Sequence, residues 1–103
     1  MSRKTLYEID MDFRAVEQQV DGLKEIAQKL KNLGNNDFEE TLRDIGVNWT
    51  GDNAAKFVAK GSSLKTDLIE NGENIMKIAH ALDEAARNMY HTELQNIDRA
   101  DDR

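Results

Sequence analysis

Trp49-Thr50-Gly51-Asp52-Asn53 separates two long helical patterns in the sequence. It contains the only tryptophan of the 103-residue chain. A tryptophan in a connection is costly unless its ring covers apolar surface. Gly51 lets the chain reverse tightly because it has no side chain to clash, and the next two residues are common helix caps. We therefore predict a turn over about residues 46–52 between two long helices, with the Trp49 ring covering the ends of both.

The composition favours helices throughout the chain. Charged residues make up 33% of the sequence, aromatic residues 6%, and proline, the main helix breaker, is absent. So few aromatic residues argue against β-sandwiches and barrels. The length allows one domain at most. We predict an all-α fold, with a helix-turn-helix hairpin over residues 10–97, an N-terminal arm over 1–9 and a flexible C-terminal tail over 98–103.

Charge and sequence patterning exclude several classes of partner. The net charge of −6 disfavours nucleic acid and anionic membrane surfaces, since both require a basic patch. No window approaches the roughly 18 apolar residues of a membrane-spanning helix, so we expect no direct membrane insertion. The N-terminus lacks the apolar core of a cleaved secretory signal peptide. The chain therefore looks cytoplasmic unless a pathway without a cleaved signal exports it.

Apolar residues recur at spacings of three and four after a capping aspartate, Asp10 or Asp12. This pattern predicts an amphipathic first helix. Its apolar seam consists of Phe13, Val16, Val20, Leu23, Ala27 and Leu30.

Gly34-Asn35-Asn36 interrupts the seam and leaves two alternatives. A separate short helix over about residues 37–45 can follow, with Asn36 and Glu39 as its capping box. Alternatively, the first helix continues through Gly34 with a bend, because single glycines inside helices are tolerated at a cost of about 1 kcal/mol.

The second helical pattern starts at Asp52 and extends over about residues 52–96. Asn71-Gly72 is a turn dipeptide that would split this helix and give a three-helix bundle as the alternative. Gly61 and Gly72 are eleven residues apart and so share one helix face. Two small residues on one face indicate close approach of a neighbouring helix. We therefore favour a continuous second helix.

Apolar side chains between residues 75 and 90 cover a wider arc than one antiparallel helix would hide. A two-helix hairpin also cannot enclose a core by itself. We predict that two hairpins pair antiparallel into a four-helix bundle. In the three-helix alternative, the same arc is buried within one chain. The predicted dimer interface consists of Ile75, Ile78, Ala79, Leu82, Ala86 and Met89.

The sequence predicts no catalytic, metal or cofactor site. His80 and His91 would lie about 16 Å apart along a helix, too far to share a metal. The absence of cysteine removes thiolate ligands and thiol nucleophiles. Carboxylates are plentiful, but a narrow bundle has little concave volume in which a pKa is shifted. We expect a protein that acts by protein–protein interaction and is not an enzyme.

An acidic, cysteine-free chain with a Trp-x-Gly turn between two long helices resembles the WXG100 (ESAT-6-like) proteins, small substrates of type VII secretion systems. The sharpest segment of the resemblance runs from Trp49 to Phe57, and we expect Phe57 to be a core residue. The resemblance implies a helical hairpin that forms a homodimer, or a heterodimer with a related WXG100-like protein. It also implies secretion of the folded dimer, without a cleaved signal peptide, by an ESX/Ess-like machine with an ATPase of the FtsK/SpoIIIE type.

The export signal of the family has two parts. One part is the Trp-x-Gly turn, which corresponds here to Trp49 and Gly51. The other is a Tyr-x-x-x-Asp/Glu motif after the second helix of the partner chain. A composite signal of this kind is presented only by a correctly paired dimer.

The second part of the signal departs from the family pattern. Tyr90 is placed as in the family, but Leu94 occupies the acidic position and the acid comes one residue early, at Glu93. Tyr90 and Glu93 still share one side of a helix. Alternatively, Leu94 and Asp98 form a hydrophobic-x-x-x-acid variant. The departure leaves room for a larger co-secreted effector that carries the missing signal.

Two functions fit these patterns. The first is a small secreted substrate or adaptor of a type VII system, acting as a dimer. The alternative is a cytosolic helical chaperone or scaffold for a co-encoded effector, because the wide apolar arc supports it equally.

Overall fold

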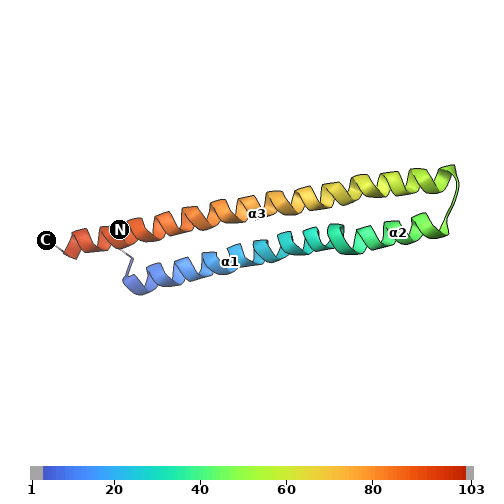
Figure 1. Ribbon diagram of the computed structural model, residues 1–103. Helices are drawn as coiled ribbons and strands as arrows, with labels where there is room; N and C mark the ends of the chain where they lie inside the picture. The colour runs from blue at the N-terminus through green and yellow to red at the C-terminus, as the bar shows by residue number, and fades with distance from the viewer. Residues whose placement is uncertain (1–3, 102–103) are drawn as a thin grey trace. The chain divides into compact units, whose positions relative to one another are not determined.

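A computed structural model describes residues 4–101 of the chain, and the side chains of residues 4–97. These residues are nearly all helical and include no strand (Figure 1), which confirms the predicted all-α class. The helical elements are α1 (Leu6–Asn32), the π-helical segment η1 (Leu33–Phe38), α2 (Glu39–Asn48) and α3 (Asp52–Asp101).

The chain divides into two compact units. Among the described residues, unit 1 consists of residues 4–23 and 77–101, and thus contains the first part of α1 and the last part of α3. Unit 2 consists of Lys24–Met76, with the end of α1, η1, α2, the turn and the start of α3.

α1 begins earlier than predicted. The Thr5 hydroxyl oxygen accepts a 3.1 Å hydrogen bond from the backbone N–H of Glu8, and the hydroxyl lies 3.2 Å from the Glu8 carboxylate. A threonine followed three residues later by glutamate is a capping box. The predicted start at Asp10 or Asp12 is therefore wrong, because Thr5 already satisfies a free amide of the first turn. The arm expected over residues 1–9 is helical from Leu6.

The first helix continues through Gly34, as one of the two alternatives predicted. Asn32 and Glu39, on the two sides of η1, keep right-handed helical backbone angles, and neither Asn32 nor Phe38 makes a side-chain capping bond. The separate short helix with an Asn36–Glu39 capping box is therefore wrong. A Cβ on Gly34 would lie 2.8 Å from Cγ1 of Ile69 in α3, so glycine allows a close contact at the π-helical segment.

Close contacts in unit 2 explain the two glycines that share one face of α3. A Cβ on Gly72 would lie 2.8 Å from the backbone oxygen of Ala27 in α1. A Cβ on Gly61 would clash with the side chain of Leu42 in α2. The prediction that these glycines mark a close neighbouring helix is confirmed.

α3 runs through Asn71-Gly72 without interruption and ends at Asp101. The split that would have produced a three-helix bundle is therefore wrong. The turn preference of this dipeptide is overridden because Gly72 is buried against α1, where a larger side chain would not fit. Helix also continues into the segment expected as a tail over residues 98–103.

The buried apolar side chains are few and mostly small. They are Ile9, Val20, Ala79 and Ala86 in unit 1, and Ala27, Leu42 and Ala54 in unit 2. Small core residues let helix backbones approach closely but bury little apolar area. Many larger apolar side chains therefore remain exposed to solvent.

Candidate functional site

The predicted turn in unit 2 is formed by residues 49–51, which join α2 to α3 (Figure 1). The N–H of Trp49 donates a 2.8 Å hydrogen bond to the carbonyl of Ile45, which closes the end of α2. Gly51 has a φ of 103°, a conformation that residues with a side chain rarely adopt. Its carbonyl accepts a 3.1 Å hydrogen bond from the N–H of Ala55 in the first turn of α3. The need for glycine at this position is confirmed.

The Trp49 ring is far more exposed than predicted. Its side chain is 59% exposed, and it meets the Phe57 ring edge-on with the ring centroids 6.1 Å apart. Phe57 was expected in the core but is itself 54% exposed. Both expectations are wrong for the single chain: Phe57 lines a second groove with Leu42 and Ile45, and the Trp49 ring is uncovered because small residues line the groove beside it. These residues are Gly46, Gly51, Ala54, Ala55, Val58 and Ala59.

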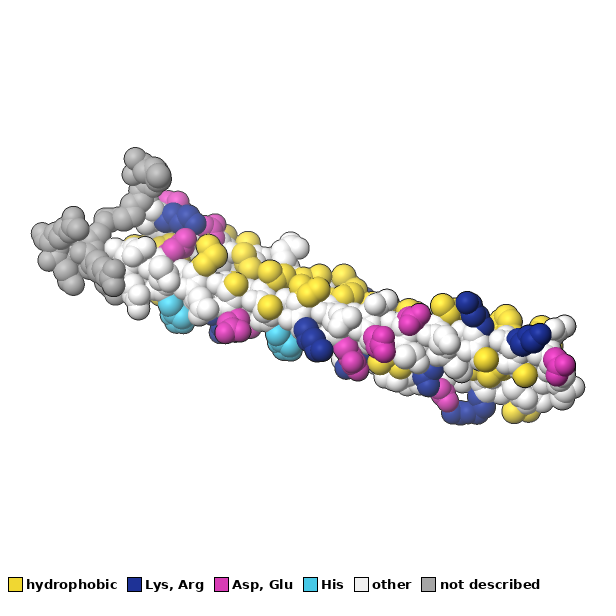
Figure 2. Space-filling view, turned by 90° about the horizontal axis from the view of Figure 1, so that it is seen from above, with side chains coloured by type: hydrophobic (Ala, Val, Ile, Leu, Met, Phe, Trp, Pro, Cys, Tyr) yellow, Lys and Arg dark blue, Asp and Glu magenta, His cyan; other side chains and the backbone are white. Residues whose placement is uncertain are grey.

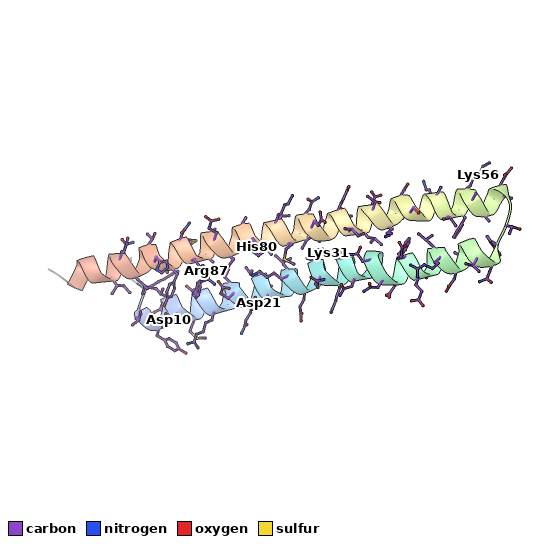
Figure 3. The ribbon with its side chains drawn as sticks, viewed as in Figure 1. Asp10, Asp21, Lys31, Lys56, His80 and Arg87 are labelled. Carbon is purple, nitrogen blue, oxygen red and sulfur yellow. The ribbon has the colours of Figure 1, made fainter. Side chains whose placement is uncertain are left out.

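Tyr90 is fixed against α1 within unit 1. Its hydroxyl donates a 2.7 Å hydrogen bond to the Asp10 carboxylate, and its ring centroid lies 4.5 Å from that of Phe13. The hydrogen bond to Asp10, together with burial and the negative charge of that group, raises the pKa of Tyr90. Figure 3 shows Asp10 on α1 in the part of unit 1 that contains these contacts. Nothing in the local sequence pattern around Tyr90 indicates Asp10 as its partner.

Glu93 pairs with Lys4, at 3.2 Å, and lines the same groove of unit 1 as Tyr90. Lys4 also lies 2.9 Å from Asp12, and these two carboxylates raise the pKa of the lysine. The expectation that Tyr90 and Glu93 lie on one side of the helix therefore agrees with the structure. Leu94 is half-buried, and the Asp98 side chain lies outside the described residues.

The six residues predicted as a dimer interface differ in their exposure. Met89, Ile78 and Leu82 are 64%, 54% and 45% exposed. Ala79 and Ala86 are 0% and 9% exposed, because they pack in the core of unit 1. The prediction is wrong for these two alanines, which already have neighbours within the chain. Ile75, the remaining residue, is half-buried in unit 2.

The exposed apolar side chains of unit 1 extend from α3 onto α1. Val16 of α1 is 42% exposed and lines one groove with Phe13 and Met89. We refer to Val16, Ile78, Leu82 and Met89 as the apolar face of unit 1. Figure 2 shows hydrophobic side chains gathered in a band on this part of α3, with the histidines at the opposite edge.

Unit 2 has an apolar groove of its own. Charged or polar side chains border it at Asp37, Thr41 and Lys60. Its apolar lining comes from η1, α2 and α3, and we refer to it as the unit 2 groove: Leu33, Phe38, Leu42, Ile45, Phe57 and Leu64.

The described side chains include no group of three metal-binding residues that could hold a metal ion. His80 and His91 are exposed, and the His91 ring lies 5.8 Å from the Tyr90 ring. In residues 4–101, no helix is both long and apolar enough to cross a membrane.

Comparisons of the chain with protein-family models, with curated proteins and with solved structures found no match. A function for this chain must therefore be inferred from its own structure, and three features of the described residues bear on it. They are the exposed Trp49 at the turn, the Tyr90 cluster, and the apolar surfaces of the two units.

Proposed function

We propose that the protein is a small WXG100-like substrate or adaptor of a type VII secretion system, which acts through protein–protein contacts. The observation that carries the proposal is the turn, where Gly51 adopts a positive φ and leaves Trp49 59% exposed. A tryptophan that served only to pack the turn would be expected to be largely buried. An exposed indole in a highly charged chain is suited to recognition, because tryptophan is enriched at protein–protein contacts.

A dimer of helical hairpins is part of the same proposal. In each copy, α1, η1 and α2 form one arm and α3 forms the other. Two copies pair antiparallel into a four-helix bundle, through the apolar face of unit 1 and the unit 2 groove. Supporting this, large side chains such as Met89 and Leu82 are left in water by the single chain, and covering them gains about 25 cal/mol per Å² of apolar area.

The export partner in this proposal is an ATPase of the FtsK/SpoIIIE type that reads the turn together with the Tyr90 segment. Asp10 occupies the hydroxyl of Tyr90 and Lys4 pairs with Glu93, so the Tyr90 ring, which lines the groove of unit 1, is the part left for recognition. Leu94 replaces the acid of the family motif, so a related WXG100-like protein or a larger co-secreted effector completes the signal. The protein thus passes from the cytoplasm to the medium without a cleaved signal peptide.

To test this function, the protein is expressed in a host with a type VII system and in the same host without the secretion ATPase, and its amount in the medium is compared. We expect the protein in the medium only when the ATPase is present, and we expect Trp49→Ala to reduce its amount there. Val47→Ala is the matched control, because Val47 is an exposed apolar residue of α2 close to the turn. Circular dichroism checks that both variants keep their helicity.

Two outcomes contradict the proposal. One is secretion of Trp49→Ala at the native level. The other is a wild-type protein that stays in the cytoplasm with and without the ATPase. Cytoplasmic retention together with tight binding of a co-encoded effector supports the alternative, a helical chaperone or scaffold.

A further inference from the structure

Unit 1 contains a pair of carboxyl groups at the contact between α1 and α3. Glu17 belongs to α1 and Asp83 to α3. The Tyr90–Asp10 hydrogen bond sets the register of the two helices in unit 1, and Glu17 and Asp83 each lie seven residues, about two turns, beyond that bond, so they face each other. Oxygen Oε1 of Glu17 is shielded from solvent and has no hydrogen-bond donor among the described residues. Two ionised carboxylates in this position repel each other, whereas a single shared proton joins them by a hydrogen bond.

Arg87 decides which of the two carboxyl groups keeps its charge. Its Nε lies 3.3 and 3.2 Å from the two oxygens of Asp83, and its guanidinium lies 6.0 Å from the centre of the Phe13 ring. Figure 3 shows Arg87 on α3 in unit 1, with Asp21 further along α1. Because the arginine favours ionised Asp83, the proton belongs on Glu17, which then donates to Asp83.

We propose that Glu17 and Asp83 form a pH-sensitive latch, which holds α1 and α3 of unit 1 together more firmly as the pH falls. The charged groups that face Glu17 are Asp83 and Arg87 from α3, and Asp21 from its own helix. The latch requires no ligand and operates whether or not the protein is exported.

The direction of the effect follows from the surroundings of Glu17. Its hydrogen bond to Asp83, its burial and the charge of Asp83 raise its pKa above the ordinary glutamate value. The folded unit therefore takes up a proton more readily than the unfolded chain. The stabilisation is complete below the ordinary pKa of glutamate and is lost as the pH rises through the raised pKa.

Carbon-13 NMR titration of the carboxyl groups in the full chain measures the pKa of Glu17 directly. We expect its midpoint above the ordinary glutamate value. In Asp83→Asn the midpoint falls, because the asparagine amide can donate a hydrogen bond to ionised Glu17. A wild-type midpoint at or below the ordinary value would overturn the proposal, and this measurement requires no variant to fold.

Urea unfolding at one protein concentration, between about pH 8 and pH 5, measures the effect on stability. We expect the wild-type midpoint to rise on acidification. Glu17→Gln, which keeps the shape and supplies a permanent donor, reduces this rise. Glu84→Gln is the matched control, because it removes one exposed carboxylate of α3 beside Asp83 and keeps the rise. If the urea midpoint depends on pH identically in wild type and Glu17→Gln, the latch proposal is wrong.

Discussion

The hydroxyl of Tyr90 donates a 2.7 Å hydrogen bond to the carboxylate of Asp10, which lies 80 residues earlier in the chain. This bond joins α3 to α1 within unit 1, beside the contact between the Tyr90 and Phe13 rings. Tyr90 therefore contributes to folding as well as being a candidate for recognition. A variant of Tyr90 tests the export proposal only when these two roles are separated.

Tyr90→Phe separates the role of Tyr90 in folding from its role in recognition, since it removes the hydrogen bond to Asp10 and keeps the ring. We expect a lower urea midpoint than in wild type, because Asp10 loses its donor, and a lower midpoint still in Tyr90→Ala, which also loses the Phe13 contact. If the ring is what the export machine reads, Tyr90→Phe is secreted and Tyr90→Ala is not. A Tyr90→Phe protein as stable as wild type would show that the hydrogen bond contributes nothing.

The close contact at Gly72 predicts opposite effects of alanine at two helical glycines. Gly72→Ala places a Cβ 2.8 Å from the backbone oxygen of Ala27, so we expect destabilisation by about 1–2 kcal/mol despite alanine's better helix propensity. Gly22→Ala in α1 meets nothing within 4 Å and gains about 0.5–1 kcal/mol. Urea unfolding measures both. Stabilisation of the chain by Gly72→Ala would contradict the close approach of α1 and α3 in unit 2.

Much of the helical structure could be predicted because its causes are local. The spacing of apolar residues and the absence of proline act within each helix, and Gly51 is required by its own backbone angle. The start of α1 was missed although Thr5 and Glu8 have the spacing of a capping box. Asp10 and Asp12 are competing candidates for the cap, but both lie inside α1, where Asp10 accepts a hydrogen bond from Tyr90 instead of capping the helix.

The partners of the candidate site residues could not be predicted. The Tyr90–Asp10 bond joins residues 80 apart in sequence, and it depends on the register of α1 against α3. No local spacing encodes that register. For the same reason the 75–90 arc could not be divided beforehand into Ala79, which is buried within the chain, and Leu82, which is exposed.

The ion pair of Glu39 and Lys65 in unit 2 predicts a pH effect on the acid side. The ammonium group of Lys65 hydrogen-bonds the carboxylate and lowers the pKa of Glu39. This stabilisation is present above the ordinary glutamate pKa and is lost as the pH falls through the lowered pKa. We therefore expect Lys65→Met to be less stable than wild type at neutral pH, with a difference that shrinks in acid.

Lys56→Met is the control for this pair, because Lys56 is an exposed lysine of the same helix. It removes the same charge without touching Glu39. Urea midpoints measured across the acid range distinguish the two variants. A difference between Lys65→Met and wild type that stays constant with pH would mean that Lys65 acts through packing rather than through its charge.

Leu82 tests whether the apolar face of unit 1 holds two copies together. Its side chain is 45% exposed, while Ala81, the next residue along α3, is exposed on another side of the helix. Glutamate at a covered interface position would bury an unpaired charge, so we expect Leu82→Glu to be a monomer at micromolar concentration and Ala81→Glu to remain a dimer like wild type. Analytical ultracentrifugation distinguishes these states. Both variants gain the same negative charge on the same helix, so dissociation of both would indicate general charge repulsion. A monomeric wild type would contradict the proposed four-helix bundle.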